Sequence, residues 1–132
     1  MGMYTQFHFG SQLKSDTPKE VIDILEFMAG ITDEEPSIIP EHEFFKCDRW
    51  KVLFRMSSAY FDYQTHCEFS EGCLSVTSNL KNYDNEIDKF VCWVSPYLRK
   101  YEGDFLGYSR YEEFEQPELI FYSLRLNTPS HE

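Results

Sequence analysis

The chain has 132 residues, which suffices for one domain that buries its own core without disulfide or metal staples. Its hydrophobic content of 42% and aromatic content of 17% argue against disorder. Twelve basic and twenty-three acidic residues give a net charge of −11, which repels the phosphate backbone and argues against nucleic-acid binding. This charge suits a basic protein partner, although solubility is its simplest explanation.

The cysteines and the apolar runs indicate a reduced protein. Cys47, Cys67, Cys73 and Cys92 show neither a CxxC pair nor the spacing of zinc ligands. The chain does not begin with the basic and apolar segments of a signal peptide, and its apolar runs are far too short to cross a membrane. We therefore expect a cytoplasmic protein with buried or half-buried thiols and no membrane contact.

The first predicted elements are a strand over residues 3–13 and a helix over residues 17–29. The strand sequence, MYTQFHFGSQL, alternates between two faces, and His8 is expected to be a packed or rim residue of it. Thr17-Pro18-Lys19-Glu20 begins the helix, with the threonine as its cap, and Gly30 ends it. The predicted buried stripe of this helix is Val21, Ile24, Leu25 and Met28.

Residues 31–49 are the least regular part of the chain, because two prolines and the acidic run Asp33-Glu34-Glu35 break any period. These carboxylates lack the spacing of a calcium loop, so a solvated charge run is the simpler interpretation. Residues 50–56 resume a period of two and predict a strand. Its apolar face consists of Trp50, Val52, Phe54 and Met56.

Residues 61–81 predict a β-hairpin around a two-residue turn, Glu71-Gly72. On its apolar face Phe69 lies opposite Leu74, and we expect a helix to bury this phenylalanine. The polar face pairs Gln64 with Asn79, His66 with Thr77 and Glu68 with Ser75. Because a shift of one residue would mix the two faces, the pattern predicts this register.

Residues 81–98 predict a second helix, capped by Asn82 or Asp84. Its apolar stripe is Ile87, Phe90, Val91, Val94 and Leu98. Trp93 in this helix and Phe27 in the first lie beside the stripes, where we expect them to fill the space between the helices. The alternative is that they line a partner site. Residues 105–111 and 119–126 predict a final hairpin with an acidic loop, and residues 127–132 a frayed tail.

Together these elements predict the fold class α+β in a single domain over residues 1–132. The predicted order is β-α-β-β-β-α-β-β. Six strands that each carry an apolar face, together with two amphipathic helices, favour one mostly antiparallel sheet with both helices packed on one face.

Catalytic and cofactor motifs are missing from the sequence. His66 and Cys67 are neighbours in a strand, so their side chains point to opposite faces and form no nucleophile–base pair. The six glycines are scattered and form no phosphate loop, and the four histidines show no metal-ligand spacing. We therefore expect no catalytic residue, no metal and no cofactor, and a binding protein rather than an enzyme.

Two surfaces are candidate binding sites. The polar hairpin face offers short polar side chains, namely Gln64, His66, Glu68, Ser75, Thr77 and Asn79. The acidic loop offers an aromatic ring surrounded by charge, a common interface anchor, namely Glu112, Glu113, Phe114 and Glu115. The simpler interpretations are the solvent face of a half-buried sheet and an ordinary surface loop.

The segments Leu80-Lys81-Asn82-Tyr83 and YEGDFLGYSRYE, residues 101–112, carry a resemblance. The chain resembles, over most of its length, a family of small uncharacterised proteins found in bacteria and their prophages. This family has no assigned activity, so the resemblance transfers no catalytic residue. It implies an accessory or phage-encoded role, such as inhibition of a host protein.

These features predict an acidic protein–protein interaction module whose partner carries a basic patch. A homodimer through an edge strand or through the open sheet face is compatible with them. One alternative is a small enzyme or ligand-binding domain with a pocket between sheet and helices. Another is a nucleic-acid mimic that blocks a basic channel, although such a mimic needs rows of carboxylates and the sequence shows patches.

Overall fold

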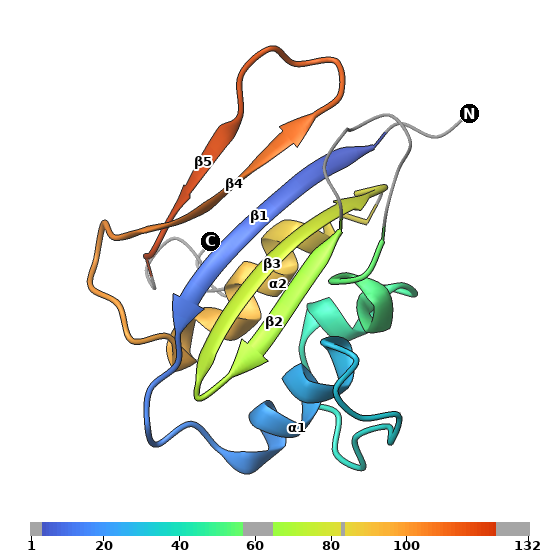
Figure 1. Ribbon diagram of the computed structural model, residues 1–132, viewed down its shortest axis with the longest axis vertical. Coiled ribbons are helices and arrows are strands. Elements are labelled where there is room, and N and C mark those ends of the chain that lie inside the picture. The colour runs from blue at the N-terminus through green and yellow to red at the C-terminus, as the bar shows by residue number, and fades with distance from the viewer. Residues whose placement is uncertain (1–3, 57–64, 83, 124–132) are drawn as a thin grey trace.

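The computed structural model describes residues 4–56, 65–82 and 84–123. Its antiparallel sheet has the spatial order β2-β3-β1-β4-β5 (Figure 1). The strands are β1 (Thr5–Gln12), β2 (His66–Ser70), β3 (Cys73–Leu80), β4 (Phe105–Tyr111) and β5 (Glu118–Phe121). The α-helices are α1 (Lys19–Met28) and α2 (Glu86–Val94), and the 3₁₀ helices are η1 (Glu43–Lys46), η2 (Trp50–Val52) and η3 (Ser95–Tyr97). The predicted α+β class with an antiparallel sheet is confirmed.

Residues 50–56 do not form the predicted strand, so the described part of the chain has five strands rather than six. These residues form η2 and a turn, in which Trp50, Leu53 and Phe54 are buried while Val52 is 38% exposed. Buried residues three and four positions apart follow a helical period. The prediction failed because this short apolar run matches a period of two almost as well.

The predicted register of the β2–β3 hairpin is confirmed where the structure describes it. The observed pairs are His66 with Thr77, Cys67 with Val76, Glu68 with Ser75 and Phe69 with Leu74. Glu71 and Gly72 have positive φ angles of 51° and 78°, as a type I′ turn requires. The predicted partner of Asn79, Gln64, lies outside the described residues.

Helix α1 buries the predicted stripe of Val21, Ile24, Leu25 and Met28. The prediction that Thr17 caps this helix is wrong. The Thr17 hydroxyl donates backwards to the carbonyl oxygen of Lys14 at 2.6 Å, and Pro18 holds the N-cap position. The threonine therefore shapes the turn before the helix rather than its first turn.

Helix α2 is shorter than predicted, but its apolar stripe is buried throughout, at Ile87, Phe90, Val91, Val94 and Leu98. The N-cap position is Asn85 rather than the predicted Asn82 or Asp84, but Asn82 Oδ1 still accepts a hydrogen bond from the backbone N–H of Ile87 in the first turn at 3.0 Å. The helix continues as η3, which contains the exposed Pro96. Proline lacks the N–H that an α-helical turn needs, so the tighter turn begins here.

An aromatic cluster around Phe90 joins α2 to the sheet and to the 3₁₀ segments. The Phe90 ring lies edge-on to Phe9, Phe44 and Phe54, with centroids 5.4, 5.5 and 5.2 Å away. In Figure 1, α2 correspondingly lies behind β1 and β3. One face of the sheet therefore forms one side of the hydrophobic core.

Phe27 and Trp93 fill space beside the 3₁₀ helices. Phe27 packs on Trp50 with ring centroids 6.2 Å apart, and Trp93 stacks on Phe44 at 5.9 Å. Both side chains are buried, so neither lines a partner site in the described part of the chain. The prediction that a helix buries Phe69 is wrong, because β2 is an edge strand and this ring is only half-buried.

Strand β5 covers the start of the predicted strand 119–126, of which residues 124–126 lie outside the described residues. A bulge interrupts its pairing with β4, since Phe105 pairs with Phe121 and Gly107 with Ile120. The extra residue is Leu106, which enters the core. Because the bulge shifts the alternation of side chains along β4, Phe105 lies on the face of the sheet opposite the core.

Gly107 is required by the close approach of β4 to β1. A Cβ at this position would overlap the carbonyl oxygen of His8 and lie 2.9 Å from the Cα of Phe9, whereas a Cβ at Gly10 would meet nothing nearer than 3.8 Å. We predict that Gly107→Ala lowers the free energy of unfolding by about 3 kcal/mol or more and that Gly10→Ala changes it by less than about 1 kcal/mol. Urea unfolding of both variants checks this, and equal losses would contradict the β1–β4 register.

Candidate functional site

The face of the sheet opposite α2 carries a row of side chains that crosses four strands. From β4 to β2 the row is Tyr108, His8, Thr77 and His66. His8 Nδ1 lies 3.1 Å from Thr77 Oγ1, and the imidazole stacks on Tyr108 with centroids 5.4 Å apart. We call this face the open face. The structure thus places two predicted residues, His66 and Thr77, in line with His8 and with Tyr108, which the sequence did not single out.

The predicted residues of the polar hairpin face differ in accessibility. His66, Glu68 and Ser75 are exposed, and His66 Nε2 lies 3.8 Å from Glu68 Oε1. Thr77 is half-buried and bonded to His8. Gln64 lies outside the described residues. The accessible part of this face is therefore smaller than the sequence predicts.

Asn79 belongs to the interior rather than to the accessible surface. It lies opposite Gln6 across β3 and β1, and their exposed fractions are 0% and 2%. The backbone N–H of Asn79 donates to the carbonyl oxygen of Met56 at 3.0 Å. Gln6 Nε2 has no hydrogen-bond partner among the described residues. A partner that binds the outer surface of this face does not reach either amide.

In the acidic loop, Glu112 has a structural role. Its Oε1 accepts a hydrogen bond from the backbone N–H of Tyr4 at 2.8 Å, and its own N–H donates to the carbonyl oxygen of Tyr4 at 3.0 Å. Glu113 and Glu115 are exposed. Phe114 is 61% exposed and packs edge-on against Tyr111 at 5.6 Å. The loop therefore offers two carboxylates and one supported ring to a partner.

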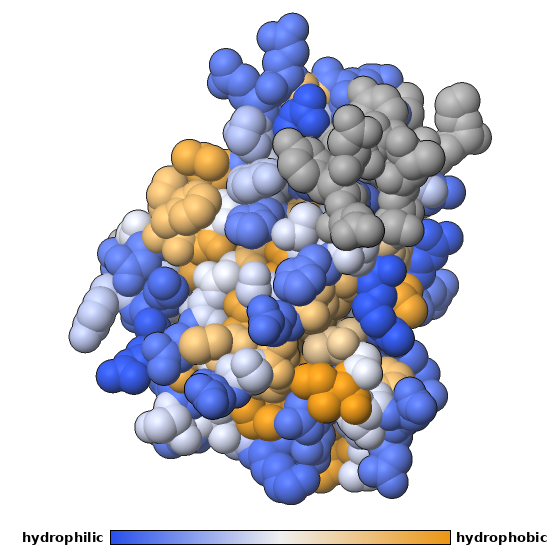
Figure 2. All heavy atoms as spheres, in the orientation of Figure 1, coloured by the Kyte–Doolittle hydropathy of each residue, from blue (hydrophilic) through white to orange (hydrophobic). Residues whose placement is uncertain are grey.

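A group of exposed apolar side chains on β4 and β5 was not among the predicted site residues. Phe105, Leu119 and Phe121, which we call the apolar cluster, are 49%, 54% and 49% exposed. Phe105 and Phe121 lie edge to face with centroids 5.9 Å apart. Leu119 pairs with Tyr108, which places the cluster on the open face. Figure 2 shows hydrophobic atoms gathered over β4 and β5.

The sequence pattern indicates part of the apolar cluster. If Ile120 and Tyr122 point to the core, as alternation in the last strand indicates, then Leu119 and Phe121 must point away from it. The position of Phe105 depends on the bulge at Leu106, and no pattern in the sequence predicts this bulge.

Three of the described thiols are poorly suited to nucleophilic chemistry. Burial raises the pKa of Cys67 to about 11, and it also raises the pKa values of Cys47 and Cys92. None of the four cysteines, all of which the structure describes, forms a disulfide. Cys67 packs against the core while His66 is exposed on the open face, so the predicted separation of the two side chains is confirmed. A raised pKa leaves little thiolate at neutral pH.

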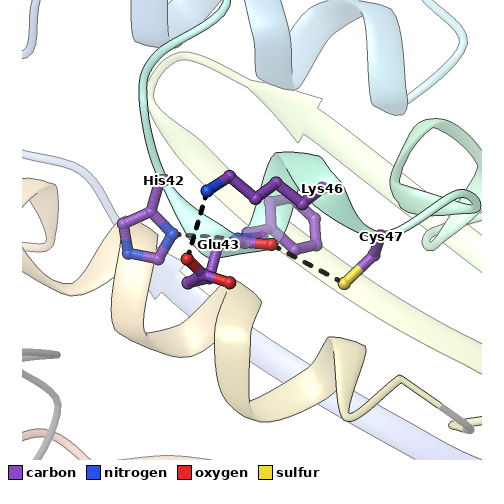
Figure 3. Close-up of polar contacts among 5 residues, drawn as sticks. His42, Glu43, Lys46 and Cys47 are labelled. Carbon is purple, nitrogen blue, oxygen red and sulfur yellow. Dashed lines mark hydrogen bonds and ion pairs between the residues drawn. The ribbon is translucent and has the colours of Figure 1, made fainter.

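His42 caps η1 through its imidazole ring. Its Nδ1 accepts a hydrogen bond from the backbone N–H of Phe44 at 3.1 Å, and Glu43 and Lys46 form an ion pair of 3.4 Å beside it (Figure 3). Phe44 is fully buried, so the cap helps to hold a core residue. Burial lowers the pKa of His42, and the Glu43 carboxylate partly offsets this effect.

Glu34 and Glu35 of the acidic run border a polar cleft between α1 and residues 32–37. Cations partly neutralise this region, with Lys19 Nζ 3.0 Å from Asp23 and Lys51 Nζ 3.1 Å from Glu35. Within the described ranges, no group of three or more His, Cys, Asp or Glu side chains is arranged to hold a metal ion. The cleft is a solvated, partly ion-paired surface.

Comparisons with protein-family models, with curated proteins and with solved structures give no match. Across the residues that the structure places, no helix combines the length and the apolar character needed to cross a membrane. The surface of the chain itself must therefore indicate the function.

The cap at His42 makes stability depend on pH. Nδ1 can accept the Phe44 N–H only while it is unprotonated, and a lowered folded-state pKa means that the unfolded chain binds the proton more readily. The stabilisation is therefore complete above the unfolded-state pKa of about 6.5 and is lost as the pH falls below it. Asparagine provides a cap acceptor that does not titrate.

We predict that between pH 7 and pH 5 the wild-type chain loses about 1 kcal/mol more unfolding free energy than His42→Asn does. Denaturant unfolding of both proteins at the two pH values measures this difference, and the carboxylates common to both cancel in the comparison. Identical pH profiles would show that His42 does not act as a neutral cap.

Proposed function

We propose that this protein is an acidic interaction module that binds a basic surface of another protein through the open face of its sheet. The observation that carries the proposal is the apolar cluster. Exposed aromatic and aliphatic side chains that touch one another and are rimmed by polar groups are the usual anchor of a protein interface. Phe105 and Phe121 have this arrangement beside Leu119.

The charges around the cluster support a basic partner. Residues 101–121, which contain β4, β5 and the acidic loop, carry six carboxylates and one cationic side chain, Arg110. Glu118 directly precedes Leu119, and Asp104 directly precedes Phe105. The negative electrostatic field of these carboxylates steers a basic surface towards the cluster, and dissolved salt weakens this field by screening it.

The contacts of the two histidines on the open face favour binding over acid–base catalysis. His8 contacts the Thr77 hydroxyl and the Tyr108 ring, and the carboxylate beside His66 is the exposed Glu68. A histidine base is normally oriented by a buried, hydrogen-bonded acceptor. Neither set of described contacts supplies one.

The setting that we propose is a reducing cytoplasm, which is supported by four described cysteines that form no disulfide. There the module acts as an accessory protein or as an inhibitor of a host protein, the role that the resemblance to bacterial and prophage proteins implies. Net charge alone is enough to direct it to basic surfaces, and the apolar cluster supplies the contact.

A pull-down from bacterial lysate at low and at high salt tests the proposal with matched variants. Leu119 in the cluster and Ile38 in the connection after α1 are 54% and 55% exposed. We predict that Leu119→Ser weakens partner capture by at least about tenfold, because it removes an interface anchor, while Ile38→Ser leaves it unchanged.

High salt should also weaken capture by the wild-type chain, because part of the attraction is between charges. Equal capture by Leu119→Ser and Ile38→Ser would show that the cluster is not the contact surface. Capture that is indifferent to salt would contradict the basic partner.

A further inference from the structure

Strand β5 is the last strand of the sheet, and its outer edge is unpaired in the described part of the chain. Tyr122 shows which backbone groups face inward, because its N–H donates to Asp104 at 2.7 Å and its carbonyl accepts from Gly103 at 2.9 Å. In an antiparallel strand these groups alternate direction. The N–H and C=O groups of Leu119 and Phe121 therefore point outward, away from β4.

The two faces of β5 differ in chemistry. Leu119 and Phe121 lie on the open face with Phe105, so one face of the edge is apolar. Glu118 pairs with Ser109 and lies on the other face. Glu102 is close enough to Tyr122 to help raise the pKa of its hydroxyl, although burial is the larger cause. The second face of the edge thus carries Glu118 as its exposed charge, beside Ile120 and Tyr122, which pack against the core.

We propose that β5 binds an extended segment of a basic partner as an additional antiparallel strand, and that this segment alternates apolar with cationic residues. The proposal rests on the proposed function and specifies how the partner is held. Main-chain hydrogen bonds to Leu119 and Phe121 supply part of the affinity, and the two faces supply the specificity. Apolar residues of the segment lie over Leu119 and Phe121, while its cationic residues reach Glu118.

A second copy of this chain fits the edge less well than a basic segment. Pairing two copies through β5 brings two chains of net charge −11 together and adds no cation to the carboxylates around the edge. The other edge of the sheet, β2, presents the polar residues His66 and Glu68 on the open face rather than an apolar anchor. Of the two sheet edges, β5 is thus the one that offers a partner both an acidic side chain and exposed apolar side chains.

The test uses the wild-type chain and a fluorescent probe, a peptide of about ten residues that alternates lysine with valine. In antiparallel pairing, the valines that lie over Leu119 and Phe121 also direct their backbone groups at β5, while the lysines direct theirs away. We expect N-methylation of the valines to weaken binding by at least about tenfold, and N-methylation of the lysines to change it by less than about threefold. Fluorescence anisotropy measures both.

A protein variant provides the matching change on the other side of the interface. Leu119→Pro removes an outward N–H but no bond to β4, whereas Leu119→Ala keeps the N–H and removes the same side chain. We expect the proline variant to bind the probe at least about fivefold more weakly than the alanine variant, with both melting at similar temperatures. If the proline variant does not fold, the N-methylated peptides still decide the question.

Each other outcome overturns the strand proposal. Equal binding of both N-methylated peptides, with loss at high salt, leaves the acidic binding module intact but shows that it holds its partner through side chains. Equal binding of a peptide that alternates glutamate with valine contradicts the basic partner and therefore the proposed function as well. A dimer in light scattering that breaks up with Leu119→Pro identifies a second copy as the occupant of the edge.

Discussion

The packing of Phe90 against both layers of the molecule is the contact on which the rest of the structure depends. This fully buried ring touches Phe7 and Phe9 of β1, Phe44 of η1 and Phe54 after η2. Interiors are close-packed, so a ring with four partner rings in three segments fixes how these segments sit against one another. Because this contact commits one face of the sheet to the core, the other face remains for polar residues and for the binding that we propose.

The open face is arranged by backbone constraints in the outer strands. Gly107 allows β4 to approach His8 and Phe9 closely, and the bulge at Leu106 then reverses the direction of the preceding side chain. Phe105 therefore lies beside Phe121 on the open face rather than in the core. A protein with net charge −11 thereby presents apolar rings at one edge of its sheet, in strands whose neighbouring residues include the carboxylates of Asp104 and Glu118. The binding function that we propose follows from this combination of apolar contact and charge.

The sequence predicted those elements whose residues have a single period. The register of β2 and β3 followed from strict alternation around Glu71-Gly72, and the stripe of α2 from helical spacing. Trp50–Phe54 was misassigned because two periods fit so short a run, and only burial distinguishes them. At the candidate site, alternation found His66 and Glu68 but could not show that Asn79 is buried. In the apolar cluster, alternation indicates the direction of Leu119 and Phe121, but the position of Phe105 depends on a bulge.

The most direct test of the open, unpaired edge is amide hydrogen exchange in the free protein, measured residue by residue along β5. The Ile120 N–H faces β4, while the N–H groups of Leu119 and Phe121 face outward. We predict that Ile120 exchanges at least about tenfold more slowly than either neighbour, because only its N–H is bonded within the sheet. Equal protection at Leu119, Ile120 and Phe121 would show that the edge is already occupied, and it would contradict a free binding edge.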